Sequence, residues 1–199
     1  KPSSAASDVY KRQLTLNESW LSRRNLFDWV FAALVLAGGL FAFARHAGSM
    51  DSYEKPILVG ALICVIAMGW FWRPLRVLAI VVAAASLLAI ASYQGDLARA
   101  DTVFWLKYFL SSQSAILWMS VLFFMSTLFY WLGFFGGKQG DALEAIGSRL
   151  AWAAITMALI GTMVRWYESH QLGPDIGHIP VSNLYEVFVL FCWLTAAFY

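Results

Sequence analysis

Residues 114–135, SAILWMSVLFFMSTLFYWLGFF, decide the fold class of this 199-residue chain. They lie within a longer stretch, from Tyr108 to Gly137, that contains no Asp, Glu, Lys or Arg. A bilayer core about 30 Å thick needs about 20 mainly apolar residues per helix, so this segment is long enough to cross a membrane. Every backbone polar group in lipid must be hydrogen-bonded internally. The segment is therefore predicted to be a transmembrane helix.

Five further apolar runs have the same character. They are residues 26–44, 56–72, 77–93, 147–166 and the incomplete run 182–199. We therefore expect an all-α fold, a polytopic transmembrane helical bundle with about six spans. The sequence Arg73-Pro74-Leu75-Arg76 is predicted to form a tight basic turn between the second and third spans, because proline breaks helices.

The overall composition agrees with a membrane protein. Hydrophobic residues make up 60% of the chain and charged residues 13%, whereas soluble domains carry about 25% charge. The net charge of +2, with no basic run, argues against a nucleic-acid partner. Cys64 and Cys192 both lie in apolar runs and indicate neither a disulfide framework nor a metal cluster.

The two ends of the chain are unusual. Residues 1–13 are polar without periodicity and begin at Lys1, so we interpret them as a non-native or disordered leader. Residues 14–199 are expected to form the N-terminal part of a multi-span membrane domain. Tyr199 closes an apolar run that has no stop signal, which predicts a fragment of a longer protein.

The distribution of basic residues favours a cytoplasmic N-terminus, since short cytoplasmic loops are enriched in Lys and Arg. In that orientation residues 168–181 form an external loop. Six basic residues are then inside and five outside. The inside set is Arg23, Arg24, Arg73, Arg76, Lys138 and Arg149, and the outside set is Arg45, Lys55, Arg99, Lys107 and Arg165.

Residues 102–110 are rich in aromatic side chains and precede the 114–135 span. Two interpretations are open: an amphipathic surface helix in the membrane interface, or a simple aromatic belt at the entry to the span. Several tryptophans also lie near predicted helix ends, where indole rings anchor to the interface. These are Trp29, Trp70, Trp72, Trp105, Trp131 and Trp166. Small residues suited to close helix contacts include Gly38, Gly39, Ser120 and Ser126.

Residues 165–186, RWYESHQLGPDIGHIPVSNLYE, concentrate polar groups at a membrane boundary, where they are costly and often functional. Asn183 and Glu186 stand three apart, a spacing that fits an N-cap with Glu186 reaching back to the free amide of Asn183. A direct ligand or substrate role for Glu186 is equally open. Pro180 and Gly177 are expected to shape the turn before this helix.

Three other residues of this region are candidates for cofactor binding. His178 and, with less support, His170 could ligate haem iron, although a loop histidine is more often simply solvated. Arg165 is expected to pair with Glu168, with a lipid headgroup or with a propionate. His46, beside Arg45, is interpreted as an interfacial residue.

Residues 177–188, GHIPVSNLYEVF, resemble the GHxPxSNLYE signature of the CcsA family of cytochrome c assembly proteins, also called ResC or CcsB. The signature positions here are Gly177, His178, Pro180, Asn183, Tyr185 and Glu186. Residues 107–131 also resemble bacterial members, and the likeness extends over residues 14–199.

The resemblance implies a membrane subunit of the system II cytochrome c synthase in the bacterial cytoplasmic membrane. Such a subunit carries haem b across the membrane and presents it for attachment to the CxxCH thiols of apocytochrome c. Its expected partners are a ResB-like subunit, apocytochrome c, haem and membrane lipid. Axial histidines would hold the iron, and reduced thiols near the thiolate form would be needed for attachment.

The family's tryptophan-rich external loop and its flanking histidines lie downstream of the signature and are not among residues 1–199. No family haem ligand can therefore be carried over to this chain, whose own enzymatic activity stays open. We expect residues 1–199 alone to be inactive and to show no haem absorbance. A transporter or permease of another class, or a non-enzymatic membrane assembly factor, are the alternative functions.

Overall fold

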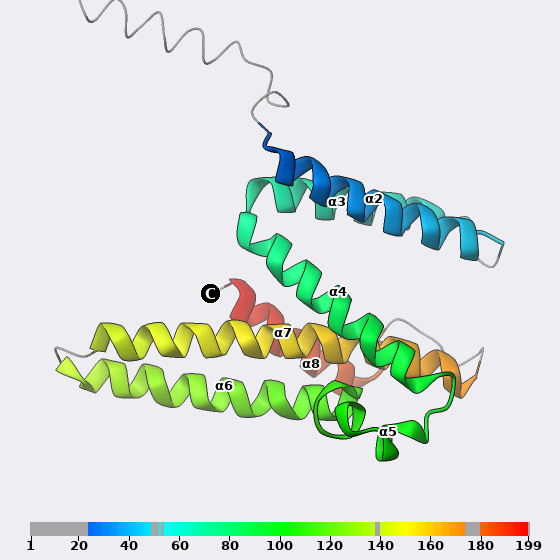
Figure 1. Cartoon of the computed structure of the whole chain (residues 1–199). Helices are drawn as coiled ribbons and strands as arrows, with labels where there is room; N and C mark the ends of the chain where they lie inside the picture. The colour runs from blue at the N-terminus through cyan, green and yellow to red at the C-terminus, as the bar shows by residue number, and fades with distance from the viewer. Residues whose placement is uncertain (1–23, 49–51, 53, 138–139, 174–179, 199) are drawn as a thin grey trace, which may run out of the picture. The chain divides into compact units, whose positions relative to one another are not determined.

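The described part of the computed structural model comprises residues 24–48, 52, 54–137, 140–173 and 180–198. This part contains helices and no strand, so the predicted all-α class is confirmed. The elements, in chain order, are α2 (Leu26–His46), α3 (Glu54–Phe71), α4 (Arg73–Tyr93), α5 (Arg99–Thr102), the π-helical turn η1 (Leu106–Leu110), α6 (Ser112–Phe135), α7 (Gly140–Leu172) and α8 (Leu184–Phe198) (Figure 1).

Four of these helices are long and apolar enough to cross a membrane: α2 over Leu26–Arg45, and α4, α6 and α7 over their full lengths. The apolar helix Lys55–Phe71 and α8 are shorter. Six apolar helices of the described residues thus occupy the six predicted runs, and four of them have the length of a membrane span. The count of six spans and the cytoplasmic N-terminus stay predictions. The predicted leader at residues 1–13 lies outside the described part of the chain.

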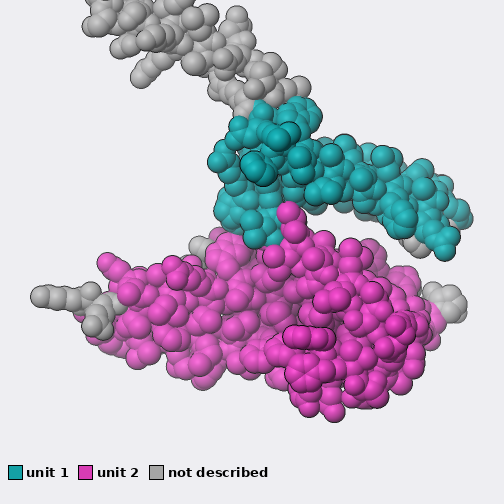
Figure 2. All heavy atoms as spheres, viewed as in Figure 1, with its two compact units in different colours: residues 1–77 teal, residues 78–199 magenta. Residues whose placement is uncertain are grey.

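The chain divides into two compact units, residues 1–77 and residues 78–199, and the boundary falls within α4 (Figure 2). In the first unit α2 and α3 lie side by side (Figure 1). Gly39 faces the side chain of Leu62 and Gly69 faces the ring of Phe31, with no room for a Cβ at either glycine. The predicted close contact is therefore found at Gly39, whereas a Cβ at Gly38 would meet open space.

The predicted basic turn at residues 73–76 is wrong. Helix α3 ends at Phe71 and α4 begins at Arg73, so Trp72 alone separates them and the four residues form the first turn of α4. Proline is tolerated there because the first-turn N–H groups have no partner within the helix and the ring presets a helical φ.

A buried ion pair stabilises the end of the first unit. Asp28 is 4% exposed and pairs with Arg76. Arg76 also donates from Nε to the carbonyl of Gly69 at 2.5 Å, and Arg24 donates to the carbonyl of Trp70 at 2.7 Å. These two carbonyls belong to the last turn of α3, whose C-terminal carbonyls lack partners within the helix. Arg24 and Arg76 therefore supply hydrogen bonds to backbone carbonyls at the C-terminal end of α3.

In the second unit α6 and α7 lie side by side along most of their lengths (Figure 1). Ser126 donates from Oγ to the carbonyl of Gly147 at 2.7 Å, which confirms its predicted place in a close helix contact. Gly161 allows the backbone of α7 to approach Ala115 and Ile116. Ser120, in contrast, donates to the carbonyl of Ile116 within its own helix.

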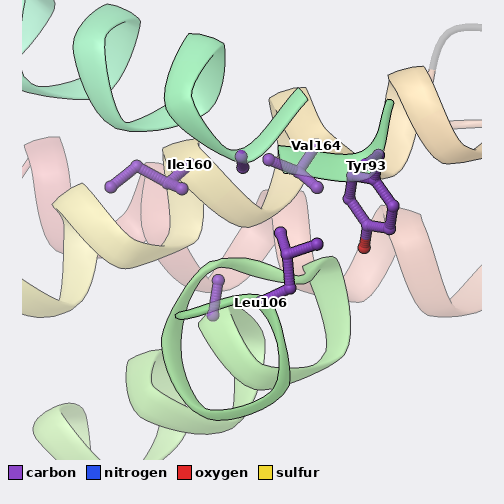
Figure 3. Close-up of a cluster of buried hydrophobic side chains, with 6 residues drawn as sticks. Tyr93, Leu106, Ile160 and Val164 are labelled. Carbon is purple, nitrogen blue, oxygen red and sulfur yellow. The ribbon is translucent and has the colours of Figure 1, made fainter. Parts of the chain in front are cut away.

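The core of the second unit gathers side chains from four elements. Tyr93 of α4, Leu106 of η1, and Ile160 and Val164 of α7 pack together with Ala89 and Ala115 (Figure 3). Tyr93, Leu106 and Val164 are at most 1% exposed. This cluster fixes the end of α4, the turn η1 and the second half of α7 against one another.

Helix α7 is longer than predicted at both ends, running from Gly140 to Leu172 rather than over residues 147–166. The predicted external loop at 168–181 is therefore wrong for residues 168–172, which are helical. Tyr167 packs on the core cluster and Glu168 bonds to α6, so tertiary contacts carry the helix past Trp166.

Candidate functional site

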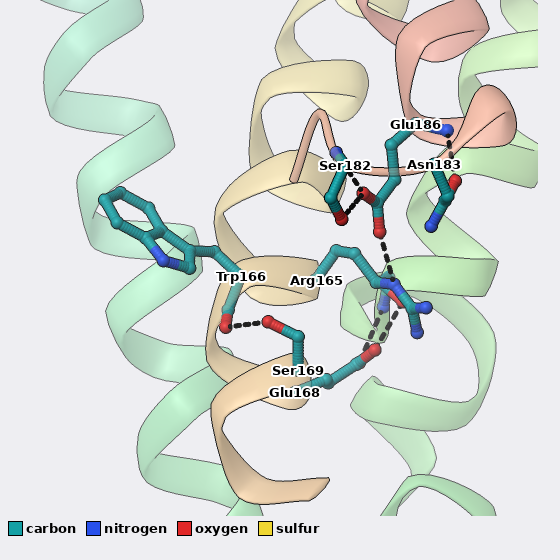
Figure 4. Close-up of polar contacts among 8 residues, drawn as sticks. Arg165, Trp166, Glu168, Ser169, Ser182, Asn183 and Glu186 are labelled. Carbon is teal, nitrogen blue, oxygen red and sulfur yellow. Dashed lines mark hydrogen bonds and ion pairs between the residues drawn. The ribbon is translucent and has the colours of Figure 1, made fainter. Parts of the chain in front are cut away.

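The polar segment identified in the sequence is brought together where α7 nears its end and α8 begins (Figure 4). Arg165 of α7 donates from Nε to Oε1 of Glu186 at 3.3 Å. The side chain of Glu186 is 7% exposed and that of Arg165 is 33% exposed. The partner of Arg165 among the described residues is thus Glu186; of the partners that the sequence left open, Glu168 is not the one found.

Asn183 caps α8 as predicted. Its Oδ1 accepts the backbone N–H of Glu186 at 2.9 Å, and α8 begins at the next residue, Leu184. The return bond differs from the prediction, because Oε2 of Glu186 accepts from the backbone N–H of Ser182 at 3.2 Å and from its Oγ at 3.3 Å. The capping arrangement is therefore displaced by one residue.

The carboxylate of Glu186 is consequently bonded through both oxygens. One oxygen meets a guanidinium from α7 and the other meets the turn that leads into α8. A buried carboxylate is costly unless it is paired and hydrogen-bonded. The contacts stabilise its charge and fasten the turn at Ser182 and Asn183 to α7.

A second carboxylate, Glu168, lies one helical turn beyond Arg165 on α7. It accepts from the hydroxyl of Tyr93 at 2.5 Å, from the backbone N–H of Ser112 at 3.0 Å and from the Oγ of Ser112 at 2.5 Å. Ser112 is the first residue of α6, where backbone N–H groups are unpaired and the helix dipole favours negative charge. Glu168 therefore caps α6 from a different helix and ties α4, α6 and α7 together.

The histidines give a mixed result. His170 is exposed and lies in the last turn of α7, where its Nε2 accepts from the indole Nε1 of Trp166 at 3.1 Å. In this geometry the lone pair of Nε2 accepts the indole N–H, which places the proton of the neutral ring on Nδ1. His178, Gly177 and the side chain of His46 lie outside the described residues.

A small pocket borders the Arg165–Glu186 pair. Its cavity volume is only about 10 Å³, about the space of one water molecule, and it is lined by Ile116, Thr162, Arg165, Pro180, Tyr185, Glu186 and Val189. Sites for small molecules usually enclose about 300–1,000 Å³, so this pocket does not by itself accommodate a molecule the size of haem. No group of three His, Cys, Asp or Glu that could hold a metal ion occurs among the described residues.

The fold and this polar site define an integral membrane protein whose buried carboxylates fasten helix ends. Over 81 residues, 40% of the chain, it is 33% identical to a protein of Chlorella vulgaris named cytochrome c biogenesis protein CcsA. The matched region amounts to 22% of the length of that relative. None of the protein-family profiles compared with the chain matches it, and no solved structure is similar.

Proposed function

We propose that this chain acts in cytochrome c biogenesis as a CcsA-type membrane protein. Two features of the sequence support the proposal: the similarity to the CcsA of Chlorella vulgaris, and the GHIPVSNLYE sequence at residues 177–186. In the proposal the chain belongs to a six-span domain with a cytoplasmic N-terminus, within a longer membrane protein.

The structural observation that carries the proposal is the ion pair between Arg165 and Glu186. Near the end of α7 Glu168 bonds to the start of α6, and at the start of α8 Glu186 pairs with Arg165 of α7. In the proposal, these two fastened helix ends support the function of the signature sequence, which begins between α7 and α8 in the chain. In the proposal, Glu186 is a positioning residue and His178 is the residue that contacts haem.

The proposed reaction has haem b as a substrate. Haem is carried to the external side and its vinyl groups add the two thiols of a CxxCH sequence in apocytochrome c, with a ResB-like subunit as partner. The described residues alone do not fit haem, because the pocket beside Arg165 is too small to hold it. The haem contacts are therefore assigned to the His178 segment and to parts of the protein beyond this chain.

The test is to express the full-length gene in its host with His178→Ala, and with His170→Ala as the matched control. Covalently bound haem is measured in membrane c-type cytochromes, with the amount of the variant protein measured in parallel. We expect His178→Ala to lower covalent haem several-fold at unchanged protein amount, and His170→Ala to leave it unchanged. Full covalent haem in the His178→Ala strain would contradict the assigned role of His178.

A further inference from the structure

The segment between α4 and α6 presents a group of exposed aromatic side chains. Phe104 and Trp105 are each 59% exposed and Tyr108 is 52% exposed, and the three rings contact one another or Phe109. Leu106, between them, is fully buried in the core cluster. One side chain thus anchors the segment to the protein while its neighbours project outward. Of the two interpretations left open by the sequence, the regular surface helix is not found, and residues 106–110 form the short π-helical turn η1.

The backbone carbonyls of this turn are bonded by side chains of α6. Ser114 donates from Oγ to the carbonyl of Lys107 at 2.6 Å, and the indole of Trp118 donates to the carbonyl of Tyr108 at 2.8 Å. An exposed turn in water needs no such donors, because solvent bonds its carbonyls. Where water is scarce, an unpaired carbonyl costs several kcal/mol, roughly, and internal donors become necessary.

The position of the segment also points to a membrane boundary. Tyr93 at the end of α4 and Ser112 at the start of α6 both bond to Glu168, so these two helix ends lie at the same level. Both helices are long and apolar enough to cross a membrane. The aromatic segment therefore lies at the common end of two candidate spans.

We propose that residues 104–109 insert into the interfacial layer of the bilayer, with lipid as the occupant of the exposed aromatic surface. Phe104, Trp105 and Tyr108 lie at the boundary of headgroups and acyl chains, where amphipathic rings are favoured. In the proposal the ammonium of Lys107, which lies 5.8 Å from the ring centre of Tyr108, pairs with lipid phosphates at the same boundary. This surface is separate from the Arg165–Glu186 site and does not depend on the function proposed above.

The experiment places a nitroxide at position 105 of the full-length protein, with Cys64→Ala, Cys192→Ala and Trp105→Cys, in vesicles of phosphatidylcholine and phosphatidylglycerol. Collision rates with oxygen, which concentrates in lipid, and with a water-soluble nickel chelate are measured by electron paramagnetic resonance. Asp101→Cys is the control, because this exposed, charged position is expected to face water. Tyr108→Cys replaces Trp105→Cys if the latter fails to fold by circular dichroism.

We expect position 105 to collide several-fold more with oxygen, relative to the nickel chelate, than position 101. Equal nickel accessibility at the two positions would overturn the proposal, since the surface would then face water. Low collision rates with both reagents would also overturn it, because protein rather than lipid would cover the rings.

A second measurement addresses the carbonyl bonds. Ser114→Ala is compared with Ser120→Ala, which removes a hydroxyl bonded within its own helix. In vesicles we expect Ser114→Ala to lower the melting temperature by several degrees more than Ser120→Ala does. Equal melting temperatures for the two variants would show that the turn is not in a water-poor layer.

Discussion

The carboxylate of Glu168 accepts the backbone N–H of Ser112 at 3.0 Å, although the two residues are 56 positions apart. Helix α6 is thus capped by an acidic side chain of α7, and the same carboxylate binds the hydroxyl of Tyr93 at the end of α4. Three helix ends meet at one negative charge. This contact stabilises the end of the bundle next to the Arg165–Glu186 site.

Glu168→Ala is expected to destabilise the protein by about 1–3 kcal/mol, because the backbone N–H of Ser112 loses its partner at a residue that is 2% exposed. The free energy of unfolding is measured in detergent micelles by titration with a denaturing detergent. Glu144→Ala, at an exposed carboxylate on the same helix, is expected to stay within about 0.5 kcal/mol of the wild type. Equal effects of the two variants would contradict the cross-helix cap.

Asp28→Asn is expected to cost about 3–5 kcal/mol, because it leaves the Arg76 guanidinium without its anionic partner in a buried site. A double-mutant cycle with Arg76→Met measures the coupling, and the double variant should recover part of the loss. Arg45→Gln, at an exposed position on α2, serves as the control. Additive losses from the two single changes would argue against the ion pair.

Gly161→Val tests the close packing of α6 on α7. A Cβ at position 161 would lie 3.0 Å from Cγ1 of Ile116 and 3.2 Å from Cβ of Ala115, so the larger side chain must separate the helices. We expect a loss of about 1–3 kcal/mol, as for other overpacked interiors. Gly60→Val on α3 is the matched control, since a Cβ there meets nothing within 4 Å. The same unfolding titration compares the two, and a neutral Gly161→Val would refute the packing.

Arg165→Gln tests whether the turn before α8 must be fastened for function. Without the guanidinium, the buried carboxylate of Glu186 keeps its bonds to Ser182 but loses its cation. We expect covalent haem in c-type cytochromes to fall several-fold, with partial recovery in Arg165→Lys. Arg149→Gln, at an exposed position earlier on α7, should be neutral. Wild-type haem levels in Arg165→Gln would show that this fastening is dispensable.

Much of the helical architecture is predictable because hydropathy acts locally. The run at residues 114–135 and the cap at Asn183 are both found in the structure, each determined by neighbours along the chain. Helix ends were less predictable. Helix α7 continues to Leu172 because Tyr167 and Glu168 make contacts with other helices, and such contacts leave no local pattern.

The paired charges show the same limit. The bonds of Glu168 to Ser112 and Tyr93, and of Asp28 to Arg76, join residues distant in sequence, and no local pattern predicts any of these pairs. The sequence does indicate that Asp28 has a partner, because a lone carboxylate inside the apolar run 26–44 must be paired. The partner itself, Arg76, is determined by the packing within the first unit.

The most direct test of the proposed role in cytochrome c biogenesis is deletion of the gene in its host, followed by measurement of covalently bound haem in all membrane c-type cytochromes. The account predicts that covalent haem is lost while b-type haem and apocytochrome c persist, and that the intact gene restores it. Unchanged covalent haem in the deletion strain would contradict the account.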